Sequence, residues 1–221
     1  MPRRAVIFDC DGTLVDSEPL SRRAWERAVR PFGYEVTAED LAACLGRDYA
    51  FTHSHFAARA PLPGPDGFWP LLTGELFPIL DSELTPFADA VSAAHELAAL
   101  DVPMAVASSS SRERLARTLA RAEMPDSITV TIAGDEVSRG KPAPDMFLAA
   151  ARRLGVAPDR CVVVEDSPAG VQAGLSAGMV CVAVARDSRD APGLSHADVV
   201  LAEVTAGSLL SAQRAPRRVA G

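Results

Sequence analysis

The sequence lacks any long uninterrupted apolar segment. A helix that crosses a bilayer needs about 20 consecutive apolar residues, and no part of this 221-residue chain reaches that length. After its first two arginines the amino terminus carries only the four-residue apolar run Ala5 to Phe8, too short for the apolar region of a secretory signal. We therefore expect no membrane partner and a cytoplasmic location.

Cysteine is scarce, and its spacing carries no metal-binding or redox signature. The four cysteines are Cys10, Cys44, Cys161 and Cys181, without a C-x-x-C pair and mostly in or beside apolar runs. Zinc sites and redox motifs usually have paired cysteine spacings, which are missing here, and structural disulfides are rare in cytosolic proteins. We expect reduced thiols in or near a hydrophobic core.

Positive charge is in the minority. The chain has 22 lysines and arginines against 29 acidic residues, a net charge of -7, and three of the arginines (Arg214, Arg217 and Arg218) lie in the last eight residues. An acidic body repels both a nucleic-acid backbone and an anionic membrane surface. We therefore expect neither nucleic acid nor a membrane as a partner. We also expect a monomer, although the charge does not fix the oligomeric state.

Aromatic residues make up only 5% of the chain and are unevenly distributed. Nine of the twelve lie between Trp25 and Phe77, whereas only two of the 21 valines lie between residues 18 and 81. Valine favours strands because its branched Cβ packs on a pleated surface. The pattern predicts a separate helical unit over residues 18–81, with an aromatic core and a turn-rich break at 61–67. Its helices are expected at Leu20 to Arg30, Ala38 to Cys44, Tyr49 to Arg59 and Phe68 to Leu80.

The rest of the chain, residues 1–17 and 82–221, alternates short apolar runs with amphipathic stretches, and the residues after Ser211 are expected to fray. Runs such as CVVV lack polar alternation, as strands covered on both faces do. The pattern predicts an α/β fold, a parallel sheet flanked by helices. Its strands are expected at Ala5 to Phe8, Met104 to Ala107, Ile128 to Ala133, Cys161 to Val164, Val180 to Val184 and Asp198 to Leu201.

Polar residues follow four of these strands. In an open parallel sheet the loops after the strands share one edge, where ligands bind. We therefore expect the residues that follow the first four strands to meet at one site: Asp9, Asp11, Ser108, Lys141, Glu165 and Asp166.

Four segments in order carry a family resemblance: DCDGTL at 9–14, VASSS at 106–110, GKPAPDMF at 140–147 and VVVEDSPAGVQAGLSAGM at 162–179. Together they resemble the motifs of the haloacid dehalogenase-like hydrolase superfamily, most closely its β-phosphoglucomutase-like phosphatase branch. The resemblance implies a Rossmann-like core with a helical cap inserted after the first strand, which matches the insertion at 18–81.

The resemblance implies hydrolysis of a phosphate monoester. Asp9 is the expected nucleophile, which would form an aspartyl-phosphate, and Asp11 the expected general acid and base. Gly12 is expected to allow a tight turn that brings backbone amides to the phosphoryl oxygens. Ser108 and Lys141 would stabilise the phosphoryl group, and Ser109 or Ser110 could contact the same group. A simpler interpretation makes Ser108 and Asp166 the N-caps of the helices that follow them.

The charge balance of this site calls for a metal cation. Asp9, Asp166 and a dianionic phosphate together carry far more negative charge than Lys141 neutralises. Mg²⁺, which binds oxygen ligands together with phosphate and water, fits best. We assign it to the Asp9 carboxylate, the Asp11 backbone carbonyl and Asp166. By resemblance Glu165 contributes too, either directly or from behind these ligands.

The segment DSEPLSRRAW at 16–25 bears on whether the protein hydrolyses or isomerises its substrate. Ser21 stands where sugar-phosphate mutases of this branch carry a histidine that couples cap closure to catalysis, which favours a phosphatase. A dehalogenase would lack Asp11. The expected substrate is a small phosphorylated metabolite, with a sugar phosphate as one candidate. A hexose-phosphate mutase and a non-catalytic binding module remain the alternatives.

Some residues of the helical unit have two interpretations. Arg47, in LGRDY at 45–49, either contacts an anionic group of the substrate or is a solvated charge at a helix start. His53 and His55 are expected to pack within the helical unit rather than bind a metal. Trp25 and Trp69 are expected in its core. The unit would open and close about linkers near Asp16 to Pro19 and Asp81 to Pro86.

Overall fold

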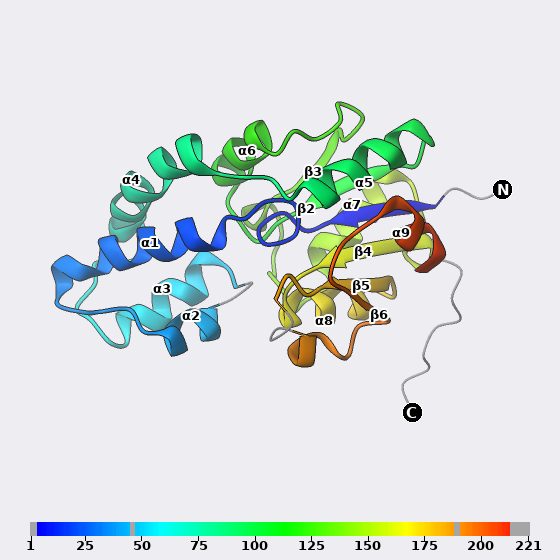
Figure 1. Cartoon of the computed structure of the whole chain (residues 1–221). Coiled ribbons are helices and arrows are strands. Elements are labelled where there is room, and N and C mark those ends of the chain that lie inside the picture. The colour runs from blue at the N-terminus through cyan, green and yellow to red at the C-terminus, as the bar shows by residue number, and fades with distance from the viewer. Residues whose placement is uncertain (1–3, 45–46, 188–190, 213–221) are drawn as a thin grey trace.

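The computed structural model describes residues 4–44, 47–187 and 191–212 (Figure 1). Leu45 and Gly46 of the LGRDY segment lie outside these ranges, as do the tail expected to fray and its arginines Arg214, Arg217 and Arg218. Among the described residues, no helix is both long and apolar enough to cross a membrane.

The centre of the molecule is a parallel sheet with the order β3-β2-β1-β4-β5-β6. β1 lies inside the sheet, and its Phe8 pairs with Val106 on one side and Val164 on the other. Every residue of β1, β2, β4 and β5 is buried, because helices cover both faces. The predicted α/β fold is confirmed. The strands are β1 (Ala5–Phe8), β2 (Met104–Ala107), β3 (Val130–Ile132), β4 (Cys161–Glu165), β5 (Val180–Val184) and β6 (Val199–Leu201).

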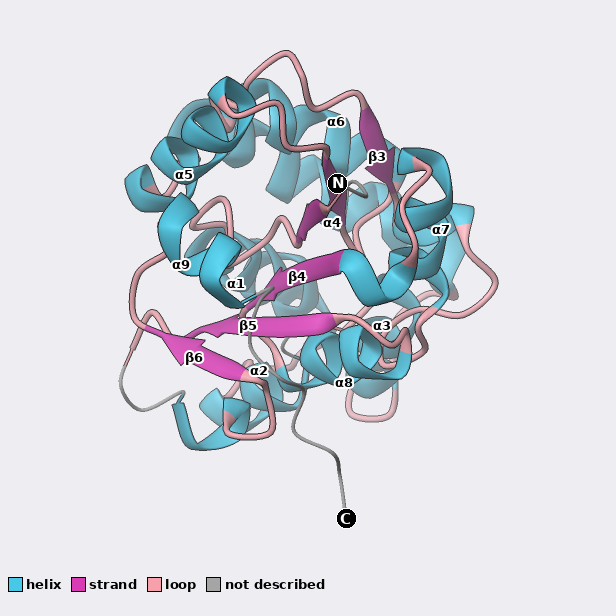
Figure 2. Cartoon of the chain, turned by 90° about the vertical axis from the view of Figure 1, so that its right-hand side faces the viewer, coloured by secondary structure: helices cyan, strands magenta, loops and turns pink. Residues whose placement is uncertain are grey.

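Successive residues of each strand face opposite layers. Val6 and Phe8 pack on the side of α5 (Ala88–Ala99), α6 (Arg112–Arg121) and α9 (Ala206–Ala212). Ala5 and Ile7 pack on the side of α7 (Asp145–Leu154) and α8 (Pro168–Ser176). Figure 2 shows α5 and α9 on one side of the sheet and α7 and α8 on the other. We call this part, β1 to β6 with α5 to α9, the sheet core.

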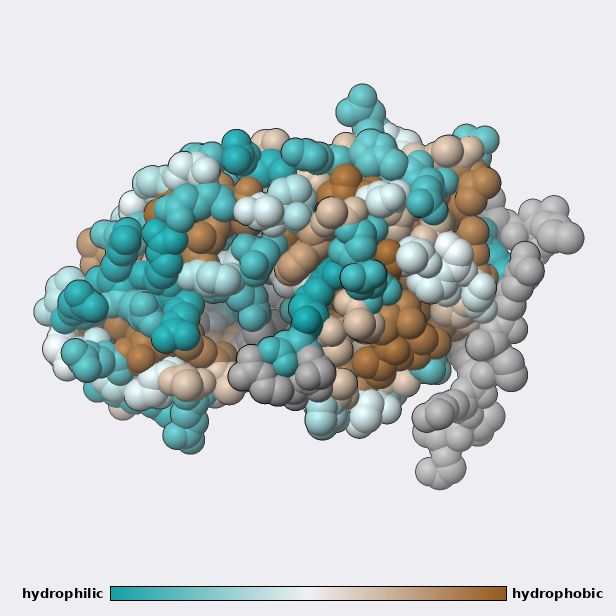
Figure 3. Space-filling view, viewed as in Figure 1, coloured by the Kyte–Doolittle hydropathy of each residue, from teal (hydrophilic) through white to brown (hydrophobic). Residues whose placement is uncertain are grey.

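Both edge strands of the sheet core are shorter than predicted. In β3 the expected residue Ile128 belongs instead to a turn, where its amide donates to the Pro125 carbonyl. In β6 the expected residue Asp198 uses its carboxylate to accept the Cys181 amide. Figure 3 shows apolar surface over β5 and β6, where Val200 is exposed. Short edges limit pairing with the sheets of other molecules.

The helical unit, α1 to α4, lies beside the sheet core on the left of Figure 1. Its core is aromatic as predicted: the Trp25 ring stacks 5.0 Å from Phe56 and 5.5 Å from Phe68, measured between centroids. Its helices are α1 (Glu18–Val29), α2 (Ala38–Cys44), α3 (Tyr49–Ala57) and α4 (Pro65–Glu83). Four short 3₁₀ turns complete the described chain: Arg30–Phe32, Gly134–Glu136, Pro158–Arg160 and Ala191–Leu194.

Helix α4 is longer than predicted at both ends. It starts at Pro65, inside the segment expected to be a loop, because proline is accepted in the first turn of a helix. It also continues through Pro70 and Pro78, each of which removes one backbone hydrogen bond. Burial of one face, which includes Phe68, Leu72 and Leu76, outweighs that loss.

Candidate active site

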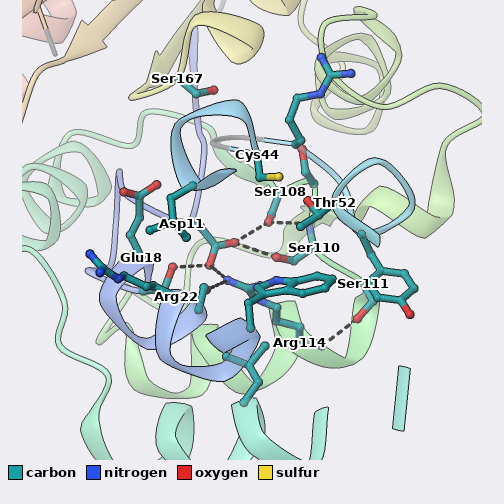
Figure 4. Close-up of a pocket in the computed structure, with 18 of the residues that line it drawn as sticks. Asp11, Glu18, Arg22, Cys44, Thr52, Ser108, Ser110, Ser111, Arg114 and Ser167 are labelled. Atoms are coloured by element: carbon teal, nitrogen blue, oxygen red, sulfur yellow. Dashed lines mark hydrogen bonds and ion pairs between the residues drawn. The ribbon is translucent and has the colours of Figure 1, made fainter. Parts of the chain in front are cut away.

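The ends of β1, β2 and β4 open into a cavity of about 440 Å³ that is lined by residues of both the sheet core and the helical unit (Figure 4). The sequence prediction that these strand ends share one site therefore agrees with the fold. Of the predicted site residues, all but Gly12 line this cavity: Asp9, Asp11, Arg47, Ser108, Ser109, Lys141, Glu165 and Asp166.

Lys141 joins two buried carboxylates. Its ammonium group donates to Asp9 and to Glu165, and all three side chains are almost inaccessible to solvent. Burial alone would lower the pKa of Lys141, but the charges of Asp9 and Glu165 raise it above its usual value. Lys141 is therefore a fixed cation next to Asp9.

Glu165 is fully engaged by donors of the sheet core. One carboxylate oxygen accepts from Lys141, and the other accepts from the Asp166 amide at 2.9 Å and from the amide and hydroxyl of Ser167 at 2.8 and 2.9 Å. Gly170 provides the space for this arrangement, since a Cβ there would lie 1.7 Å from Glu165 Oε1. Glu165 thus orients Lys141 and the turn that carries Asp166.

The carboxylates of Asp9, Glu165 and Asp166 form a cluster in which one oxygen of each lies within 4.8 Å of the others. Burial raises the pKa of Asp166 well above its usual value, and the charges of Glu165 and Asp9 add to this. Burial also raises the pKa of Asp9, against the opposing charge of Lys141. An oxygen-only donor set with excess negative charge fits a hard divalent cation such as Mg²⁺.

Asp11 is held by a different set of partners. One carboxylate oxygen accepts from Ser17 at 2.6 Å and Arg114 at 2.8 Å, and the other from Ser108 at 3.1 Å and Ser110 at 2.8 Å (Figure 4). Burial alone would raise the pKa of Asp11. The charge of Arg114 and the hydroxyl hydrogen bonds outweigh it and lower the pKa to about 2. Asp11 is therefore an oriented carboxylate in this arrangement.

Arg114 and Ser17 are site residues that the sequence analysis missed. Arg114 on α6 also donates to the Ser21 hydroxyl of α1 at 2.9 Å, so one guanidinium links the sheet core, Asp11 and the helical unit. Ser17 occupies the N-cap position of α1 but makes no capping hydrogen bond, because its hydroxyl serves Asp11. Arg114 is one of several arginines on an amphipathic helix, and nothing in its spacing marks it as the one that faces the site.

Gly12 shapes the turn between Asp11 and the rest of the loop. Its φ of +81° lies in the left-handed region, and a Cβ there would lie 1.9 Å from Asp166 Oδ2. Its amide donates to the Val15 carbonyl at 2.8 Å. Gly12 thus permits the close approach of Asp166, while the contact with substrate stays a prediction.

The serines that follow β2 have different roles. Ser111, not Ser108, is the N-cap of α6 and accepts the Arg114 amide. The Ser109 hydroxyl is buried and has no hydrogen-bond partner among the described residues. In the same way Ser167, not Asp166, caps α8. The interpretation of Ser108 and Asp166 as helix caps is therefore wrong, and both are available to the site.

The structure also shows the contacts of the residues that the sequence analysis singled out in the helical unit. The Arg47 guanidinium lies 4.0 Å from the centroid of the Phe51 ring, and its Nε is buried without a partner in the described chain. Arg47 is therefore not a freely solvated charge. His53 Nε2 meets the Pro63 carbonyl, and His55 Nε2 meets Asp40, so both histidines pack within the unit as predicted. Trp69 stacks edge-on against Tyr49.

Comparisons with known proteins show what the chain is similar to. A family model described as haloacid dehalogenase-like hydrolase matches residues 3–178. The chain is 35% identical to hexitol phosphatase A of Escherichia coli over 90% of each chain. It is 32% identical to the fructose-1-phosphate phosphatase YqaB of the same organism, over 81% of this chain and 95% of that one. A β-phosphoglucomutase structure from Clostridium difficile shares the fold with a TM-score of 0.83 at 17% identity, covering 96% of this chain and 97% of that one.

Proposed function

The chain belongs to the haloacid dehalogenase-like hydrolase family, and from this premise we propose that it is a Mg²⁺-dependent phosphatase acting on a small phosphorylated metabolite. The observation that carries the proposal is the buried pair of Asp9 and Lys141, with Asp166 beside it and Asp11 two residues along the chain. This arrangement holds a carboxylate nucleophile and a cation together where water is scarce. We further propose a cytoplasmic monomer.

In the first step, a carboxylate oxygen of Asp9 attacks phosphorus, the bond from phosphorus to the substrate oxygen breaks, and Asp11 protonates that oxygen. In the second step Asp11 removes a proton from water, the water oxygen attacks phosphorus, and phosphate leaves with Asp9 restored. In this structure Asp11 is paired with Arg114 as a carboxylate, which is the form that accepts a proton in the second step. To act as acid it must leave Arg114 and take up a proton.

Asp9, Asp166 and the Asp11 backbone carbonyl are the residues we assign to the metal. When bound there, Mg²⁺ supplies positive charge to the phosphoryl oxygens and balances the carboxylates. Glu165 already accepts four hydrogen bonds, which favours its placement behind these ligands, where it positions Lys141. Ser109, whose buried hydroxyl has no partner among the described residues, is a hydroxyl donor for the phosphoryl group. Ser108 would also donate to it, after its hydroxyl releases Asp11.

Ser21 supports hydrolysis over isomerisation. The family's mutases carry a histidine at this position, whereas here the Ser21 hydroxyl accepts from Arg114. We propose residues 18–81 as a cap and residues 1–17 and 82–221 as the catalytic core. Movement of the cap would admit the substrate and then exclude water. The names of the curated relatives make sugar phosphates the first substrates to assay.

Release of inorganic phosphate from para-nitrophenyl phosphate and a panel of sugar phosphates tests this proposal. We expect turnover with Mg²⁺, none with EDTA, and a fall of about 10⁴-fold or more in Asp9→Asn. Asp126→Asn, at an exposed position outside the cavity, is the matched control and should keep full activity. Turnover that survives in Asp9→Asn contradicts the proposal, and isomer formed without net phosphate would identify a mutase.

A further inference from the structure

The two sides of the cavity differ in their chemistry. The sheet core contributes carboxylates, hydroxyls and Lys141, which together suit a phosphoryl group. The helical unit contributes the polar side chains of Glu18, Ser21, Arg22, Arg47, Tyr49 and Thr52. It also contributes a group of aromatic and aliphatic side chains, which we call the apolar wall: Trp25, Leu41, Phe56, Trp69, Leu72 and Leu76. A molecule that fills the cavity therefore meets the buried charges of the sheet core at one end, and at the other end the apolar wall with polar side chains beside it.

The apolar wall is built into the core of the helical unit. Phe56, Leu72 and Leu76 are almost wholly buried, and Trp25 is only 8% exposed. The Trp25 and Phe56 rings stack with an interplanar angle of 30°. Close packing of this kind fixes the wall before a ligand arrives, so its apolar character is a property of the fold rather than of a mobile side chain.

Two polar side chains beside the apolar wall, Tyr49 and Thr52, already have partners within the protein. The Tyr49 hydroxyl donates to the Pro65 carbonyl at 2.6 Å, and the Thr52 hydroxyl donates to the Asp48 carbonyl at 3.0 Å. Cys44 offers only a weak thiol donor. A polyhydroxylated chain placed against this wall would give up hydrogen bonds to water and find few replacements.

We propose that the preferred substrate is a phosphate monoester of an apolar alcohol, with its phosphoryl group at Asp9 and its hydrocarbon part against the apolar wall. This inference rests on the proposed function and narrows it. A cavity of about 440 Å³ accommodates a small ester of this kind. Arg47 lies at the same side with its guanidinium over the Phe51 ring, and its buried Nε has no hydrogen-bond partner among the described residues.

Two esters of primary alcohols test the inference in the Mg²⁺-loaded wild-type protein: 2-phenylethyl phosphate and sorbitol 6-phosphate. Because both leaving groups are primary alcohols, their difference reports recognition rather than leaving-group chemistry. We expect kcat/KM for 2-phenylethyl phosphate to be about 10- to 200-fold higher, the range that one methylene of apolar contact already provides. Equal or better turnover of sorbitol 6-phosphate overturns the inference, as does no turnover of 2-phenylethyl phosphate.

The reference compound para-nitrophenyl phosphate distinguishes a failure of the proposed phosphatase function from a failure of the proposed apolar substrate. Its leaving group is activated, so it needs little recognition of the alcohol. No phosphate release from it with Mg²⁺ would count against the proposed function. Release from it together with a preference for sorbitol 6-phosphate would leave the phosphatase in place and overturn only the apolar substrate.

A matched pair of leucines provides the second measurement. Leu41 is half-buried and lines the cavity, whereas Leu71 on α4 is 46% exposed and lies outside it. We expect Leu41→Asn to raise KM for 2-phenylethyl phosphate about 10-fold and to reduce the preference over sorbitol 6-phosphate. Leu71→Asn should alter neither, and melting curves of both variants check folding. An unaltered preference in a folded Leu41→Asn overturns the inference.

Discussion

The sheet core and the helical unit face each other across one cavity, yet they bury opposite kinds of side chain, charged in the first and aromatic in the second. The sheet core buries Lys141 between Asp9 and Glu165 at the ends of three strands. The helical unit buries the Trp25 ring among other aromatic rings. Charged groups need fixed hydrogen-bond partners, which strand ends and turns provide, whereas apolar contacts need only shape. Under the proposals above, the sheet core would carry out the reaction and the helical unit would recognise the alcohol.

Replacing the central cation should have the largest effect on the sheet core. In Lys141→Met we expect phosphate release to fall below detection and the free energy of unfolding to drop by about 3–5 kcal/mol, because two carboxylates lose their buried partner. Urea unfolding and phosphate release measure the two effects. The same change at an exposed cation, Arg121→Met, is the control. Normal activity in Lys141→Met would place the chemistry elsewhere.

A smaller effect is expected from Gly12→Ala, which removes no functional group from the site. The added Cβ would sit on Asp166 at a backbone conformation that alanine rarely adopts. Displacement of Asp166 by about 1 Å should cost about 10²-fold in kcat. Gly33→Ala in the helical unit is the control, since Gly33 has a similar φ of +78° and open space around its Cβ. Its activity should stay close to wild type, and equal losses in both variants would show that strain alone is responsible.

The smallest effect on activity is expected from Asp40→Asn in the helical unit. Burial alone would raise the pKa of Asp40, but hydrogen bonds from Thr37, His55 and Tyr34 outweigh it and lower the pKa below its usual range. We expect the free energy of unfolding at pH 7 to fall by about 1–3 kcal/mol, with phosphate release retained at low temperature.

The pH dependence of that loss has a defined sign. Because the folded-state pKa of Asp40 is depressed, its ionised form contributes stability above the unfolded-state value of about 3.9, and the contribution is lost as pH falls further. Urea unfolding at pH 7 and pH 3 should therefore show a larger difference between wild type and Asp40→Asn at pH 7. A difference that grows at low pH would contradict the interpretation.

The sequence predicted the sheet core better than the helical unit. β1, β2 and β5 have the predicted bounds, because runs without polar residues are typical of strands covered on both faces. The residues after these strands reach one site because a parallel sheet brings strand ends together. In the helical unit only α2 has the predicted bounds, since α4 continues through Pro70 and Pro78 where tertiary burial overrides local preference.

The missed residues share a physical cause. Arg114 and Ser17 are surface-type residues near helix starts, and only packing decides which of them turns toward Asp11. Asp9 and Lys141 were found because their motifs are local in sequence. The apolar wall was not anticipated either, because Trp25 and Trp69 were expected to serve the core alone, whereas they also line the cavity.

The position of β1 also has a consequence for how the chain folds. Its two neighbours in the sheet, β2 and β4, lie about 100 and 160 residues later in the chain. Contacts so distant in sequence form slowly, whereas the helical unit is one continuous segment and can pack early. In a growing chain, Asp9 would therefore lie at the end of an unpaired strand until β2 has been made, and the carboxylate cluster could assemble only after β4.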